Sequence, residues 1–239
     1  MKKILTYLFS LILIGSLAFL YSFSLARNSS KIINETPIEF VEGENNFLTQ
    51  QMVNKLLIQN NREVKNQPKS TLDLQGLEHV VLSNPYIEDA TVFYTIDGVL
   101  KTIVKQRTPV ARINANNSSY YVDKQGVKVP LSTNYSARVI LITGKINNEN
   151  LKEITGFVNV ILADDFLKKE VIGIHKTQNK EFILSVRSGR YKIEFGSLEK
   201  MNVKFKKLKA FYNKASADKT IDQYKTINLK YHNQVVCAK

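Results

Sequence analysis

The sequence predicts an α+β protein with three parts: an N-terminal transmembrane helix, a small domain of order strand-helix-helix-strand-strand, and a β-rich domain with two or so packed helices. Three observations support this prediction. Residues Ile4 to Ala26 contain no charged side chain. A block of about 70 residues then combines helical and two-residue hydrophobic periods. Beyond Thr108-Pro109 most apolar segments have the short lengths and β-branched content of strands.

The N-terminal segment is long enough to cross a bilayer. A helix rises about 1.5 Å per residue, so about 20 apolar residues span the hydrocarbon core. Lys2 and Lys3 precede the run, and by the positive-inside rule they keep the N-terminus in the cytoplasm. We expect residues 1–3 to form a cytoplasmic stub and Ile4 to Ala26 an uncleaved anchor. A cleaved signal peptide is the alternative, because Ser24-Leu25-Ala26 offers small residues three apart.

The small domain is predicted over residues 38–108, after a polar linker at 27–37. Ile38 to Val41 is a short apolar run that predicts a strand. Thr49 is expected to cap a helix, because its hydroxyl can accept a backbone N–H of the first turn. The apolar face of that helix holds Met52, Val53, Leu56 and Leu57.

A second helix and a hairpin complete this domain. Leu74, Leu77 and Val81 share one helix face, and Asn84-Pro85 ends the helix. Two strands follow, joined at Asp97-Gly98, which suits a tight turn. The strands are predicted at Ile87 to Thr95 and Val99 to Arg107.

The β-rich domain is predicted over residues 109–236, with a short tail at 237–239. One helix is expected at Asn150 to Asp165, where Asp164-Asp165 would end it with solvated charge. A lysine-rich helix is expected at Leu198 to Tyr212. It fits either a core-packing helix with a solvated lysine face or a basic amphipathic helix on a membrane surface. Strands are predicted at Val110 to Ile113, Tyr120 to Val122, Val127 to Val129, Val139 to Thr143, Ile172 to His175, Glu181 to Val186 and Tyr191 to Phe195.

Residues Tyr224 to Val236 are predicted to form one terminal strand, with Ile227, Leu229 and Tyr231 on its buried face. An edge strand exposes unpaired N–H and C=O groups, and another chain can add to it. This strand could therefore bind a partner, or it could be the last strand of a sheet whose edge is covered.

Composition and motifs argue against an enzyme. The formal net charge of +13 favours anionic partners, of which nucleic acid is the weaker choice for a domain outside the cytoplasm. The single cysteine, Cys237, allows no internal disulfide and no cysteine-based metal site. No nucleotide-binding, P-loop, serine-hydrolase or metalloprotease motif is present. We expect no catalytic residue, no metal, no cofactor and no small-molecule substrate.

Several short motifs, in order, resemble the FtsQ/DivIB cell division family. Leu100 to Ile113 is similar to its "L.I.V.ER.PVA.I" run, with Gln106 where Glu is usual. Tyr121 to Val127 is similar to its "YVD..G.V" hairpin, and Ile227 to Val235 to its terminal "IDLRY.N.V" strand. The small domain resembles a POTRA domain, through Leu77-Glu78, Asn84 to Ile87 and Ala90 to Val92.

The resemblance implies a non-enzymatic, single-pass inner-membrane protein of the divisome, concentrated at the septum, with its C-terminal domains in the periplasm. It implies that the protein links early and late division proteins and contacts other divisome membrane proteins. It also implies that the terminal strand binds an FtsB–FtsL pair by strand addition, through Lys230, Tyr231, Asn233 and Val235. The alternative is a POTRA-type adaptor or chaperone in envelope protein export, whose small domain would receive substrate at its own sheet edge.

Overall fold

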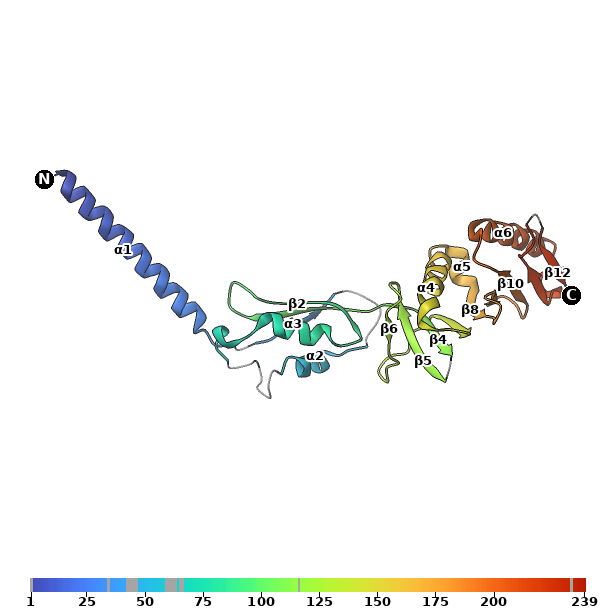
Figure 1. Ribbon diagram of the computed structural model, residues 1–239, viewed down its shortest axis with the longest axis horizontal. Helices are drawn as coiled ribbons and strands as arrows, with labels where there is room; N and C mark the ends of the chain where they lie inside the picture. Colours follow the sequence, from blue (N-terminus) through green and yellow to red (C-terminus); the bar gives the residue numbers. More distant parts are fainter. Residues whose placement is uncertain are drawn as a thin grey trace. The chain divides into compact units, whose positions relative to one another are not determined.

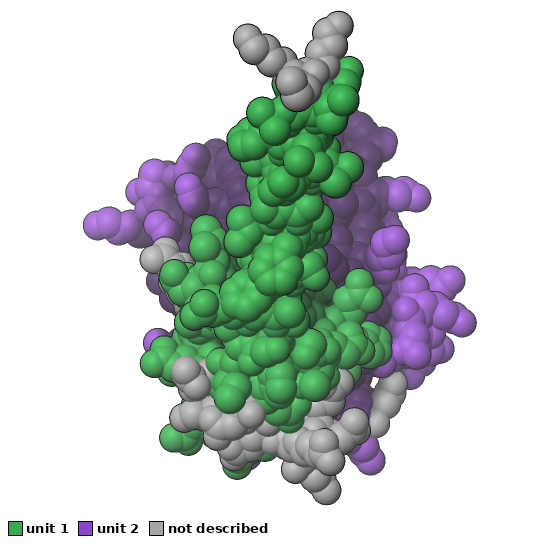
Figure 2. Space-filling model, turned by 90° about the vertical axis from the view of Figure 1, so that its left-hand side faces the viewer, with its two compact units in different colours: residues 1–106 green, residues 107–239 purple. Residues whose placement is uncertain are grey.

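The computed structural model describes residues 2–33, 35–41, 47–58, 64, 67–115, 117–232 and 234–239. Asn233 and Met1 therefore lie outside the described residues. The chain divides into two compact units, residues 1–106 and 107–239, which are coloured separately in Figure 2. Each unit is described by itself below.

Unit 1 begins with α1 (Lys2–Ser29), the blue helix of Figure 1. Its Ile4–Ser29 segment is long and apolar enough to cross a membrane, and none of it is buried within the protein. Leucine, isoleucine and phenylalanine side chains are exposed along its whole length. Such continuous exposure is costly in water and favourable in lipid, as in a membrane anchor or a signal sequence.

A small α+β domain follows α1, and its helices begin at side-chain caps. Thr49 accepts a hydrogen bond from the Met52 N–H at 3.3 Å, as predicted, and Asp73 accepts one from the Gly76 N–H at 3.0 Å. The three-stranded sheet has the order β1-β3-β2, with β1 parallel and β2 antiparallel to β3. The elements are β1 (Ile38–Phe40), α2 (Gln50–Leu56), η1 (Lys69–Thr71), α3 (Leu74–Leu82), β2 (Ile87–Tyr94) and β3 (Leu100–Gln106).

Gln106 and Arg107, which stand where the family motif has "ER", have separate structural roles. The Gln106 side chain accepts hydrogen bonds from the N–H groups of Phe47 and Leu48 and donates one to the Leu48 carbonyl. A glutamate here could accept both bonds but could not donate the third. Arg107 lies 2.6 Å from buried Asp123, the aspartate of the "YVD" hairpin motif. The two motifs therefore meet at the start of unit 2.

Unit 2 contains one nine-stranded sheet of order β12-β11-β10-β9-β8-β7-β4-β5-β6. Strand β7 runs parallel to both of its neighbours, β4 and β8, and β11 runs parallel to β10. The remaining pairings are antiparallel. The strands are β4 (Pro109–Ala115), β5 (Ser118–Asp123), β6 (Lys128–Val129), β7 (Ile140–Gly144), β8 (Val171–Lys176), β9 (Phe182–Val186), β10 (Lys192–Gly196), β11 (Thr226–Asn228) and β12 (Val236–Ala238).

Three helices, α4 (Asn148–Leu162), α5 (Asp165–Glu170) and α6 (Met201–Ala217), pack on this sheet (Figure 1). A short 3-10 turn, η2 (Ile221–Gln223), follows α6. Phe157 of α4 and Phe205 of α6 stack at 6.0 Å between ring centroids, and both contact Phe195 of β10. Because α6 buries Phe205, Leu208 and Tyr212, the structure favours the core-packing interpretation of this lysine-rich helix over the membrane-surface one.

The predicted role of Asp164-Asp165 is wrong, because the helix ends earlier and a second one begins there. Asp164 is the N-cap of α5 and accepts hydrogen bonds from the N–H groups of Phe166 and Leu167, both at 3.1 Å. It also pairs with Lys209 of α6. The hydrogen bond from Lys209 and the two backbone N–H groups lower the pKa of Asp164 despite its partial desolvation.

The Asp164 contacts predict a pH-dependent contribution to stability. Asp164→Ala should lower the free energy of unfolding by about 1 kcal/mol through loss of the cap. Asp164→Asn keeps a capping oxygen, so it should lose only the smaller share from the ion pair. The folded-state pKa lies below the ordinary value of 3.8. The difference between wild type and Asp164→Asn should therefore be constant above that value and disappear as the pH falls through the folded pKa.

Urea denaturation of the three proteins between pH 7 and pH 2 measures this difference. A wild-type advantage over Asp164→Asn that persists unchanged at the acid end would contradict the assignment of the ion pair.

Candidate functional site

The C-terminal edge of the unit 2 sheet is the candidate functional site, and it differs from the predicted single strand. Residues Tyr224 to Val236 do not form one strand. β11 ends at Asn228, a turn follows, and β12 pairs back on β11 in antiparallel register. Cys237 and Ala238, predicted as tail, belong to β12.

The turn after β11 is held by one local hydrogen bond and by bonds from α6, and these take the place of continued strand pairing. The Asn228 side chain accepts a hydrogen bond from the Lys230 N–H at 2.9 Å, an Asx-type contact that competes with extended pairing. Lys207 of α6 donates to the Tyr231 carbonyl at 2.5 Å and to the His232 carbonyl at 3.3 Å. These two carbonyls therefore accept from a helix side chain. In a continuous strand, they would be available to a neighbouring strand.

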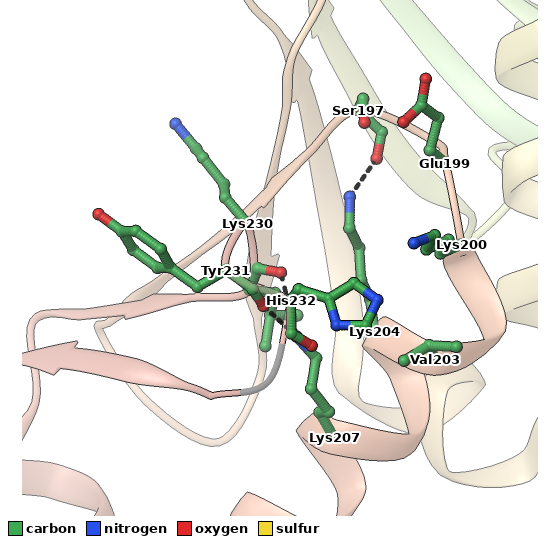
Figure 3. A pocket seen from close by; sticks show the side chains of 10 residues that line it. Ser197, Glu199, Lys200, Val203, Lys204, Lys207, Lys230, Tyr231 and His232 are labelled. Carbon is green, nitrogen blue, oxygen red and sulfur yellow. Dashed lines mark hydrogen bonds between the residues drawn. The ribbon is translucent and has the colours of Figure 1, made fainter.

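The structure describes three of the four predicted partner-site residues, and each of the three lies in a different environment. Tyr231, expected on the buried face, is 52% exposed, and its ring points away from α6 in Figure 3. Lys230 lies 2.7 Å from Glu181, and that hydrogen bond raises the pKa of Lys230. Val235 is half-buried and packs against the core, so it is a support for the edge. Asn233 lies outside the described residues.

A pocket of about 160 Å³ lies between this turn and the start of α6 (Figure 3). Its lining includes Lys200, Lys204, Lys207 and Lys230, with Glu199 as the acidic residue. Lys204 is buried and donates to the Ser197 carbonyl at 2.7 Å. Burial, and then the nearby Lys207 charge, lower the pKa of Lys204. The pocket is therefore a positively charged surface beside the turn.

This charge belongs to a wider asymmetry in the chain. Residues 107–239 contain 24 lysines and arginines against 11 aspartates and glutamates, which equals the whole net charge of +13. Unit 1 contains 10 of each and is neutral. A partner with acidic groups is therefore attracted to unit 2 and not to unit 1.

β12 is the outer strand at this end of the sheet, and within the described residues no strand pairs with its other side. The Lys192 N–H of β10 donates to the Lys225 carbonyl, just before β11, at 3.0 Å. Because backbone groups alternate in direction along a strand, Ile227 directs its N–H and C=O groups to β10. Its two neighbours in β11 direct theirs to β12. Those neighbours pair with Val236 and Ala238. Cys237, between them, turns its N–H and C=O away from β11.

Sequence reasoning missed Lys207, Asn228 and Cys237 as parts of this site. Lys207 comes from a helix 24 residues before the turn that it holds, and spacing gives no sign of that contact. Among the described residues, no group of three or more histidine, cysteine, aspartate or glutamate side chains is placed to hold a metal ion. The arrangement is suited to binding an extended, acidic polypeptide.

Comparison with known proteins assigns both units. The family described as "FtsQ/DivIB, C-terminal related" matches residues 108–238, and a POTRA-like domain matches residues 41–105. The cell division protein DivIB of Clostridium acetobutylicum is 26% identical over 125 residues, covering 47% of this chain and 50% of that protein. The chain thus spans about half the length of the curated relative that it matches. The chain belongs to the FtsQ/DivIB family of cell division proteins.

Proposed function

We propose that this protein is a non-enzymatic scaffold of the divisome that binds an FtsB–FtsL pair by adding a partner strand to β12. In this proposal residues 4–26 anchor the chain, residues 27–37 link it to the POTRA-like domain at 38–108, and the domain that begins at residue 109 carries the partner site. The short N-terminal stub lies in the cytoplasm and both domains lie outside it. The protein would then connect early and late division proteins, including other divisome membrane proteins, at the septum.

The observation that carries the proposal is the position of β12 at the end of the described sheet, with Tyr231 exposed in the turn that precedes it. Strand addition supplies main-chain hydrogen bonds, and neighbouring side chains supply specificity. An exposed aromatic residue next to an unpaired edge is suited to anchor such a partner. The positive pocket beneath the turn favours a partner segment with acidic residues near its added strand.

Tyr231→Ala should weaken binding of the FtsB–FtsL pair from the same organism about 30-fold, since a hot-spot aromatic contributes about 2 kcal/mol. Tyr231→Phe keeps the ring and should bind within about threefold of wild type. The full-length protein in nanodiscs would be titrated with the purified pair and binding followed by interferometry. Equal affinity of wild type and Tyr231→Ala would remove Tyr231 from the interface.

Cys237→Pro tests strand addition itself, because proline removes the outward N–H of β12 and leaves the bonds of Val236 and Ala238 in place. We expect at least about tenfold weaker binding, from loss of one ladder bond and of strand geometry. Cys237→Ala is the matched control, since it removes the same side chain and keeps the N–H. The same titration measures both variants, and thermal unfolding shows whether each remains folded.

If Cys237→Pro binds as tightly as Cys237→Ala, the partner does not add a strand to β12. If wild type itself does not bind the pair, the scaffold proposal fails in this form.

A further inference from the structure

The POTRA-like domain has an outer strand that is longer than β12. In the order β1-β3-β2, strand β2 pairs on one side with β3 and lies at the end of the sheet. It is eight residues long, whereas β12 has three. By length alone, β2 is the better template for an incoming strand.

The hairpin shows which N–H groups of β2 face outward. Thr95 N–H donates across the hairpin to the Val99 carbonyl at 2.9 Å, so Thr95 faces β3. Because the direction alternates along an antiparallel strand, Ala90, Val92 and Tyr94 direct their N–H groups away from β3. These three groups are the donors that an added strand would need.

Two of these three donors already bond to carboxylates of the protein itself. The Val92 N–H donates to Glu78 Oε2 at 3.1 Å, and the Ala90 N–H donates to Asp89 Oδ1 at 3.0 Å. Glu78 belongs to α3, the helix that packs along β2, and its side chain is half-buried. Both bonds join a backbone N–H to a charged acceptor, which makes them stronger than the neutral bonds of a ladder.

An incoming strand at β2 would therefore have to displace the Glu78 carboxylate from Val92. The displaced carboxylate would then lie beside the carbonyl oxygens of the new strand, where two acceptors face each other and no donor lies between them. A bond would be exchanged for a weaker one, and a half-buried charge would lose its partner.

The β12 edge differs in this respect. Within the described part of the chain, no side-chain carboxylate bonds to the outward N–H of Cys237, and the nearby charge is positive. A strand arriving there displaces no such acceptor.

We propose that Glu78 is a specificity-determining residue that closes the β2 edge to strand addition and thereby favours β12 over β2 for a strand-adding partner. The closure of β2 stands on the geometry of unit 1 alone. The choice of β12 rests on the proposed function.

The test uses the full-length protein in nanodiscs and a synthetic peptide with the sequence of β3, Leu100 to Gln106, carrying a photo-cross-linker. This peptide matches β2 in antiparallel pairing, as β3 does. Wild type should capture little peptide at β2, whereas Glu78→Ala should capture about tenfold more, because its Val92 N–H is free to pair. Mass spectrometry of the cross-linked fragments identifies the strand that was labelled.

Two control variants separate the hydrogen bond from the charge. Glu78→Gln keeps an oxygen acceptor but loses the charge that strengthens the bond, so it should capture an amount of peptide between those of wild type and Glu78→Ala. Glu39→Ala removes one carboxylate from β1, at the other end of the same sheet, where it pairs with Lys101, and it should match wild type. Capture at β2 in wild type equal to that in Glu78→Ala would overturn the proposal, as would an increase in Glu39→Ala of the same size.

Amide exchange in wild type gives a second test that needs no variant. With selective ¹⁵N labelling, the outward Val92 N–H should exchange about tenfold more slowly than the outward Tyr94 N–H, since a bonded amide must open before it exchanges. Equal rates would overturn the closure. Neither measurement uses FtsB or FtsL, so a failure of the divisome proposal and a failure of this one are distinguishable.

Discussion

The packing of α6 on the unit 2 sheet is the constraint on which the candidate site depends. Phe205 lies against Phe157 and Phe195, which fixes the helix by its apolar face. At its other end, Tyr212 donates to Glu170 and accepts from Tyr191 at 2.6 Å, in a buried cluster of polar groups. Burial raises the pKa of Tyr212, so the hydroxyl stays protonated and continues to donate. With α6 fixed at both ends, Lys207 lies where it can hold the turn between β11 and β12.

Because of that turn, the segment predicted as one long strand forms two short strands, β11 and β12, with an exposed aromatic residue between them. The carbonyls of Tyr231 and His232 accept from Lys207, so the polar backbone of the turn is satisfied without a neighbouring strand. The Tyr231 ring is then directed to solvent. The same helix therefore supplies the core and the geometry of the surface.

The two sheets of the chain treat their outer strands differently. In the POTRA-like sheet, Glu78 and Asp89 accept from backbone N–H groups of β2. In the larger sheet, β12 is kept short and lies beside a positive pocket. Charged groups on an edge are one means by which proteins limit unwanted pairing. Of these two edges, β2 has backbone N–H groups bonded to carboxylates, whereas β12 follows a turn with an exposed aromatic residue and a basic pocket.

Much of the fold was predictable because its elements follow local rules. The apolar run of α1, the Thr49 cap, the helix face of Leu77 and Val81, and the turn at Gly98 each depend on residues close in the sequence. The short helix α5 was not predicted from the sequence. An aspartate pair after an apolar helix is compatible both with the end of that helix and with the N-cap of a new one.

The sequence by itself determined the α+β class, the membrane-length helix and the order of family motifs, since these depend on hydrophobic period and on short-range caps and turns. Only the tertiary structure decided that Tyr231 is exposed, that Lys207 holds its turn and that Glu78 bonds to the edge of β2. Each of these depends on a hydrogen bond between segments 14 to 24 residues apart. Alternation along a strand predicts burial only while the strand continues, and here a contact from another element ended it.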